Sequence, residues 1–222
     1  MVRWLLCFLC VVVTGLMPEV GGGYTDIGED RNINSEPVLA VLEINATENV
    51  VAAYKSNAQP RLIELRVGET VRGVKNLGVV GTAVTSERML AISADSFQWH
   101  SLPLEFGEES ANSYISQNLG LFVTMNRCVI FDADLDGFYV YDIPFGQTPV
   151  AQEVVPKLAV IVTMEQAIGY DAGSGVFQVS EFQIGETSRE IEASVNMISV
   201  VTSERTLLFQ GTTGRWMERI RQ

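Results

Sequence analysis

The chain has 222 residues and a formal net charge of −12 at pH 7, from 27 acidic and 15 basic residues. This excess of negative charge disfavours sequence-independent binding to phosphate backbones and anionic lipids, so we expect no nucleic-acid partner. The length suits one all-β domain, because such domains commonly reach about 200–250 residues.

Residues 1–22 have the composition of a secretory signal peptide. Arg3 precedes the apolar run Trp4–Leu16, and Pro18 and small side chains near Gly22 follow it. The run is shorter than the roughly 20 residues that a membrane span needs. We therefore expect cleavage near Gly22, a secreted or periplasmic mature chain, and no stable membrane insertion after cleavage. An uncleaved anchor is the alternative.

Cysteine usage agrees with a mature chain without disulfides. Cys7 and Cys10 fall inside the signal peptide, which leaves only Cys128. A single cysteine cannot form an intramolecular disulfide. Cys128 follows the third-repeat copy of a recurring motif described below, where other repeats carry small or apolar residues, and is expected to fill the core.

A four-residue motif that begins with threonine recurs at a fixed interval of 39 residues. Its copies are Thr85–Arg88, Thr124–Arg127, Thr163–Gln166 and Thr202–Arg205. A second motif, an apolar residue followed by Gly and by Glu or Gln, keeps the same interval at 67–69, 106–108, 145–147 and 184–186. Residues 27–29 and Ala46–Asn49 supply fifth copies if the first repeat holds one extra residue. A constant interval of this size marks a repeat architecture, and five repeats account for residues 27–222 as one domain.

Each repeat is expected to form a four-stranded sheet. In one unit, residues 71–76, 78–85, 88–94 and 97–104 are rich in β-branched, aliphatic and aromatic side chains and are separated by short turns. One such sheet cannot bury both faces alone, whereas several arranged radially can. The chain thus resembles β-propeller repeat proteins at the level of architecture, which implies an all-β, five-bladed β-propeller. A β-solenoid is the alternative. The first strand would fall at 33–37, a poor strand sequence, so the first blade is expected to be irregular.

The acid of the second motif and the base of the first stand 19 residues apart in every regular repeat. The pairs are Glu69 with Arg88, Glu108 with Arg127, Gln147 with Gln166, and Glu186 with Arg205. Acid and base change to glutamine together, which is expected of groups in contact. We predict exposed Glu–Arg contacts that brace the turns, with a Gln–Gln hydrogen bond in the fourth repeat. A ring of arginines that binds anions is the alternative.

An aromatic residue also recurs every 39 residues, as Trp99, Phe138, Phe177 and Trp216. Aromatic side chains at a repeated strand position usually pack between sheets, although they could stack on sugar rings. The candidate ligand-binding residues, from this column and the neighbouring turns, are Asp95, Trp99, His100, Tyr139 and Trp216.

Asp132, Asp134 and Asp136 match the opening of a calcium loop, because alternating carboxylates converge on the ion and Gly137 permits a sharp turn. The later ligands of such a loop are missing, since Val140 and Ile143 occupy their places. These aspartates are therefore a weak metal candidate, and a hairpin turn is the simpler interpretation.

Short connections leave almost no insertions to carry catalytic groups, so we expect a chain that is not an enzyme and needs no cofactor. The favoured function is a monomeric scaffold that binds a partner protein. The alternative is a lectin-like propeller that binds a glycan.

Overall fold

The computed structural model describes residues 42–108 and 111–220. The chain divides into two units, residues 1–36 and 37–222, and only the second contains described residues. The predicted signal peptide with Cys7 and Cys10, and the motif copy at 27–29, lie outside the described residues. None of the described residues lies in a helix, so this part of the chain contains no helical segment able to cross a bilayer.

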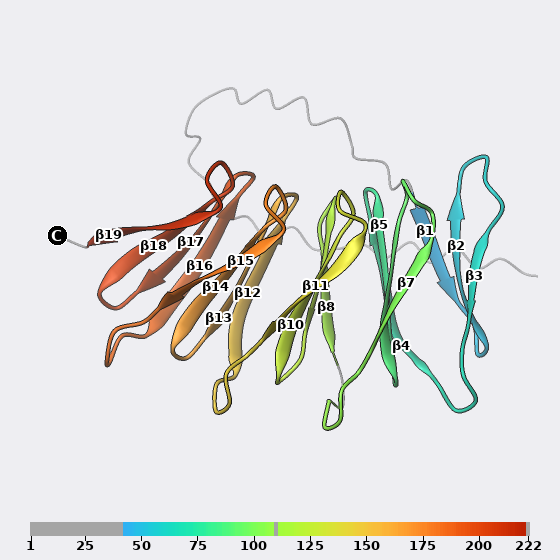
Figure 1. The fold of residues 1–222 in the computed structure, drawn as a ribbon, viewed down its shortest axis with the longest axis horizontal. Coiled ribbons are helices and arrows are strands. Elements are labelled where there is room, and N and C mark those ends of the chain that lie inside the picture. Colours follow the sequence, from blue (N-terminus) through green and yellow to red (C-terminus); the bar gives the residue numbers. More distant parts are fainter. Residues whose placement is uncertain (1–41, 109–110, 221–222) are drawn as a thin grey trace, which may run out of the picture. The chain divides into compact units, whose positions relative to one another are not determined.

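The described residues form five antiparallel sheets, each built from consecutive strands (Figure 1). The first sheet contains β1 (Leu42–Ala46), β2 (Val50–Lys55) and β3 (Arg61–Glu64). The second contains β4 (Val71–Leu77), β5 (Val80–Thr85), β6 (Arg88–Ser93) and β7 (Trp99–Pro103). The third contains β8 (Asn112–Ile115), β9 (Leu119–Val123), β10 (Arg127–Asp132) and β11 (Gly137–Asp142). The fourth contains β12 (Pro149–Val155), β13 (Leu158–Thr163), β14 (Gln166–Asp171) and β15 (Val176–Glu181). The fifth contains β16 (Ser188–Ser194), β17 (Met197–Thr202), β18 (Arg205–Gln210) and β19 (Arg215–Ile220).

The predicted all-β fold with one sheet per repeat is confirmed. The four regular repeats each give four strands, and the described part of the first repeat gives three. In the second repeat the strand ends agree with the predicted turns to within about two residues, because short polar or Gly-containing turns interrupt the β-branched runs. Closure of the five sheets into a ring stays a prediction.

The hairpin motif of the first sheet lies one residue later than predicted, so the predicted motif copy at Ala46–Asn49 was wrong. The Thr47 N–H donates to the Val50 carbonyl at 2.8 Å, and the Thr47 hydroxyl donates to the same oxygen at 3.3 Å. The Thr85 hydroxyl makes the corresponding bond to the Arg88 carbonyl. The motif therefore begins at Thr47, and Val50 takes the place of the arginine. A constant interval could not reveal this shortened step.

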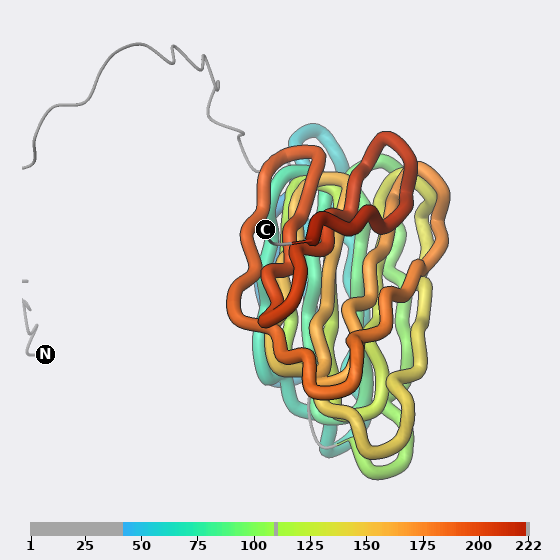
Figure 2. Tube along the Cα trace, turned by 90° about the vertical axis from the view of Figure 1, so that its left-hand side faces the viewer, coloured from blue at the N-terminus to red at the C-terminus, as the bar shows by residue number. Residues whose placement is uncertain are grey.

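The core lies between consecutive sheets. The middle strands β5, β6, β9, β10, β13 and β14 are buried at every residue, which requires cover on both faces. One apolar cluster joins each sheet to the next. In chain order, the four clusters contain Val51 with Leu90, Met89 with Phe122, Ile130 with Ile161, and Val160 with Val200. Figure 1 shows the sheets following one another in chain order, and the turned view in Figure 2 shows them overlapping face to face.

Glycines on the middle strands let the sheets approach closely. A Cβ atom on Gly169 would stand 2.7 Å from the Phe209 ring of the next sheet. Cys128 is fully buried in the cluster between the third and fourth sheets, and this burial raises the pKa of its thiol to about 12. It therefore acts as a small core side chain and is not poised as a nucleophile.

Candidate functional site

Four loops at one edge of the sheets carry the apolar-Gly-acid motif, and each connects the last strand of one sheet to the first strand of the next (Figure 1). In every loop the N–H of the motif's third residue donates to the carbonyl three residues earlier, as Glu69 does to Arg66 at 2.9 Å. The glycine before it has φ between 82° and 88° in Gly68, Gly107, Gly146 and Gly185. A positive φ at this position is what a type II turn requires, so the turn itself demands glycine.

The residue before each glycine lies at the tip of its turn and is fully exposed. The relative exposures are 104% for Val67, 106% for Phe106, and 108% for both Phe145 and Ile184. The neighbouring hairpin turns add Met125 and Met164, which are also exposed. Because packed sheets stand about 10 Å apart, the tips form a row along one edge. We call these six residues the apolar ridge.

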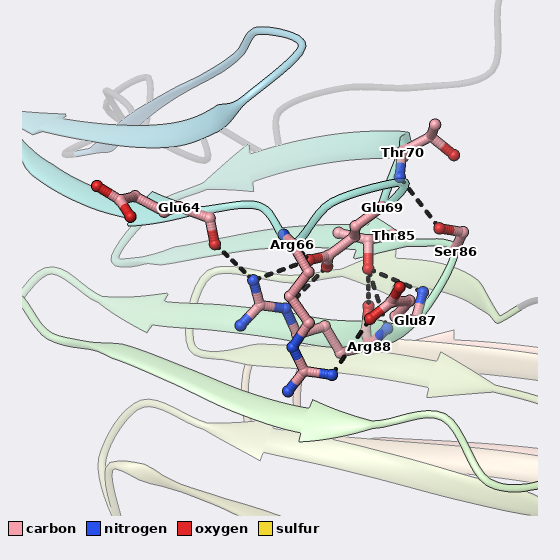
Figure 3. A network of polar contacts seen from close by, with 8 residues as sticks. All are labelled: Glu64, Arg66, Glu69, Thr70, Thr85, Ser86, Glu87 and Arg88. Carbon is pink, nitrogen blue, oxygen red and sulfur yellow. Dashed lines mark hydrogen bonds and ion pairs between the residues drawn. The ribbon is translucent and has the colours of Figure 1, made fainter.

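The turns rest on buried ion pairs, shown for the second repeat in Figure 3. Arg88 donates through Nε to Glu69 Oε1 at 2.8 Å and through Nη2 to Oε2 at 3.0 Å. Its Nη2 also donates to the Glu64 carbonyl at 2.7 Å, and the Arg66 N–H donates to Glu69 at 2.8 Å. Thr85 Oγ1 accepts from the Arg88 N–H at 2.9 Å, which fixes the hairpin turn and explains the threonine. One arginine thus ties the end of a sheet to the hairpin of the next.

The third and fifth repeats contain the same arrangement. Arg127 donates to both oxygens of Glu108 at 3.0 and 2.8 Å, and Arg205 donates to both oxygens of Glu186 at 3.0 and 3.1 Å. The glutamate side chains are 0% exposed and the three arginines between 4% and 10%. The expectation of exposed pairs was therefore wrong, because the turn and the next hairpin close over each pair.

Hydrogen bonds keep the three buried glutamates ionised. Burial alone would raise the pKa of Glu69, but hydrogen bonds from Arg88, from the Arg66 N–H and from Thr85 outweigh it and hold the pKa below its ordinary value. The pKa of Glu108 and that of Glu186 are lowered by the same balance, with Arg127 and Arg205 as the main donors.

The fourth repeat lacks the ion pair, and the predicted Gln–Gln hydrogen bond was wrong. Gln147 instead accepts from the Thr163 hydroxyl at 2.7 Å and donates to Glu165 at 2.9 Å. Gln166 donates to the Tyr141 hydroxyl at 3.3 Å. In the described residues no hydrogen bond joins the two glutamines, because each shorter amide finds a nearer partner.

The tryptophans proposed as ligand-binding residues join neighbouring sheets. The Trp99 indole N–H donates to the Arg61 carbonyl and the Trp216 indole N–H to the Gln178 carbonyl, both at 3.0 Å. Each bond therefore reaches the last strand of the preceding sheet. Phe138 and Phe177, the other members of this column, pack against the clusters between sheets.

The other candidate ligand residues lie on the last strands and on the β6–β7 and β10–β11 turns. His100 Nε2 lies 3.1 Å from Asp136 Oδ1, which also accepts from the Ser96 hydroxyl at 2.8 Å. Tyr139 packs on Tyr170 with ring centroids 5.6 Å apart. Asp95 is exposed on the β6–β7 turn.

The three aspartates of the calcium-like sequence point to different partners. Asp132 accepts from the Tyr170 hydroxyl and the Asp134 N–H, both at 2.9 Å, and burial raises the pKa of this carboxyl. Asp134 lies beside Asn118, and Asp136 binds Ser96 and His100. Among residues 42–108 and 111–220, no group of three or more His, Cys, Asp or Glu side chains could hold a metal ion.

No protein-family model matches the chain, and no curated protein is similar to it in sequence. The solved structures to which it is similar have TM-scores of about 0.4. Hsv2 of Kluyveromyces lactis has a TM-score of 0.42 at 13% identity, over 83% of this chain and 62% of Hsv2. The N-terminal domain of Nup159 has a TM-score of 0.39 at 10% identity, over 82% of this chain and 58% of that domain. HIRA(644-1017) has a TM-score of 0.40 at 10% identity, over 78% and 52%. The chain thus spans about three fifths of the length of Hsv2.

The apolar ridge was missed in the sequence, although its signal was present. Val67, Phe106, Phe145 and Ile184 stand before the turn glycine in all four regular repeats. An apolar residue at the second position of a type II turn has no core to enter, because the tip points away from both strands. Its repetition was therefore a sign of an exposed surface.

Proposed function

We propose that the chain is a non-enzymatic scaffold that binds a partner protein along the apolar ridge. The observation that carries this proposal is the complete exposure of four apolar turn tips in register along one edge. Exposed apolar side chains gathered along one edge of a folded protein are typical of an interaction site, and aromatic residues contribute most to such interfaces. Burying one large apolar side chain contributes about 1.5–3 kcal/mol, so a few tips suffice for specific binding.

The loops that carry the ridge are also well suited to recognition. Each tip stands on a glycine turn above a buried, doubly hydrogen-bonded ion pair or, in the fourth repeat, above Gln147 bound to Thr163. Such support fixes the tips before a partner arrives and reduces the entropy that binding would cost. This position of the interface replaces the last-strand surface around Asp95 and Tyr139.

The proposal includes a five-bladed ring, a monomer and a secreted or periplasmic location. A protein partner is favoured over a glycan, because the rings of Trp99 and Trp216, which a sugar would stack on, pack against the apolar clusters between sheets. A protein is favoured over an anionic membrane because the chain carries a net charge of −12.

The test is recovery of partners from the native envelope or culture fluid by the tagged mature chain. The ridge variant carries Phe106→Ser and Phe145→Ser. The control variant carries Leu62→Ser and Val195→Ser, in β3 and in the β16–β17 turn, which alter exposed apolar residues away from the ridge, 62% and 68% exposed. We expect a stoichiometric protein that the wild type and the control retain and the ridge variant loses. Retention by the ridge variant, or ridge-dependent binding to lipid vesicles in place of a protein, would overturn the proposal.

A further inference from the structure

A groove opens beside the ridge where the fourth repeat lacks its ion pair. It has a volume of about 440 Å³ and lies between the β13–β14 hairpin turn and the loop that enters the fifth sheet. Its lining residues include Gln147 and Gln166, the acids Glu165, Glu181 and Glu186, and the ridge residues Met164 and Ile184. The groove thus combines apolar walls with acidic and amide groups.

Glu186 is paired with Arg205, but the negative charges of the other two lining acids, Glu165 and Glu181, are not compensated. No lysine or arginine lines it, and in the described part of the chain no ion pair reaches Glu165 or Glu181. Two acids at the corresponding loops of the second and third repeats do have cationic partners. Glu87 pairs with Arg66 at 3.2 Å, and Glu105 pairs with Arg127 at 3.0 Å.

The other repeats show which chemical group binds between the carboxylate and the main-chain carbonyl at this place in the fold. In each of them a guanidinium from the chain itself lies among a carboxylate and a main-chain carbonyl, as Arg205 lies between Glu186 and the Glu181 carbonyl. The fourth repeat supplies only the shorter, neutral Gln166. Carboxylates and amide oxygens arranged to accept hydrogen bonds favour a planar cation with several donors.

We infer that this groove receives an arginine side chain of the partner protein, with apolar residues on either side of it in contact with Met164 and Ile184. The inference rests on the proposed function, and it names the partner's chemistry. The partner would present a short segment in which arginine stands between apolar residues. Its guanidinium would donate to Glu165 and Glu181, and its neighbours would cover the ridge on both sides of the groove.

The experiment uses three capped tripeptide amides in which the central residue between two leucines is arginine, citrulline or glutamate. Citrulline has the shape of arginine without its charge. Each peptide is titrated into the isotopically labelled mature chain, and amide shifts are followed by NMR. We expect saturable shifts at Gln147, Gln166 and Gly185 with the arginine peptide, and affinity at least about tenfold weaker for the citrulline peptide.

Two variants locate the binding. Glu165→Gln with Glu181→Gln removes the charge of the groove and should weaken arginine-peptide binding about tenfold, whereas the control Glu204→Gln, an exposed acid of the fifth repeat, should not. Gln147→Glu with Gln166→Arg rebuilds the internal ion pair and should also abolish binding.

Equal shifts with arginine and citrulline, no shifts at all, or unchanged binding to the charge-neutralised variant would overturn the inference. The two proposals fail separately. If the ridge variant loses the partner protein while the charge-neutralised variant keeps it, the proposed function stands and the arginine site does not.

Discussion

The fourth repeat and the three ion-paired repeats form the same turn, but different side-chain contacts support it. In the second, third and fifth repeats a buried guanidinium links the end of one sheet to the hairpin of the next. In the fourth, two amides bind separate neighbours, and the turn keeps its geometry with Gly146 at φ 88°. The turn therefore does not need the ion pair to adopt its shape. The ion pair makes removal of either partner costly.

The largest effect should come from removing one member of a buried pair. Arg127→Ala leaves Glu108 buried without its main partner, which is expected to cost about 3–5 kcal/mol of unfolding free energy. Gln166→Ala, the matched change in the fourth repeat, should cost about 0.5–1.5 kcal/mol because only one neutral hydrogen bond is lost. Urea unfolding of both variants measures the difference, and equal losses would contradict the comparison.

The second largest effect should come from acid, which is expected to lower the contribution of the ion pairs to the unfolding free energy. The pKa values of Glu69, Glu108 and Glu186 are lower in the folded state than in the unfolded chain, so the folded state binds fewer protons. Their contribution is therefore complete above the unfolded pKa of about 4.3 and is lost as the pH falls through the folded pKa.

The double variant Glu108→Gln with Arg127→Gln copies the fourth repeat and should lessen this loss. The measurement is the unfolding free energy between pH 6 and 3 for both proteins, taken as about six points per protein across the unfolded carboxyl pKa of about 4.3. An unchanged slope would mean that these pairs do not set the acid sensitivity.

A smaller effect is expected when the fourth repeat is converted to the ion-paired form. Gln147→Glu with Gln166→Arg should change the unfolding free energy by about 1 kcal/mol or less, because the cost of burying two charges offsets their attraction. Each single change should destabilise more than the double change. Additive single effects in thermal or urea unfolding would show that the two positions do not interact.

The smallest effect concerns the ridge. Phe106→Ser and Phe145→Ser remove side chains that are fully exposed in the free chain, so the unfolding free energy should change by no more than about 0.5 kcal/mol. Urea unfolding checks this, and a loss above about 2 kcal/mol would mean that these rings are buried within the fold.

Much of the architecture could be predicted from the sequence, because the interval of 39 residues repeats turns and strands together. The pairing of Glu69 with Arg88 could be proposed because acid and base change to glutamine at matching positions. The burial of that pair could not, since it depends on how the next hairpin covers the turn. The shortened step at Thr47 was hidden because Ala46 keeps the regular interval.

The candidate ligand-binding residues named from the sequence make contacts within the fold that could not be read from the sequence. Trp99 and His100 are chemically conspicuous, and sequence reasoning gives such residues functional roles. In the structure their polar groups bind main-chain and side-chain partners within the fold. Phe106 and Phe145 look like core residues until the turn beneath them is known.

In each loop the residue that the turn requires, the glycine with positive φ, is distinct from the apolar residue that the turn exposes to solvent. Gly107 and the glutamate after it hold the turn, while the Phe106 ring contacts solvent alone. The tip residues can therefore change by single substitutions at little cost to the rest of the repeat. Each loop has one residue that can be substituted independently of the others. The apolar ridge as a whole can therefore change its side chains, and with them its binding preference, while the sheets stay the same.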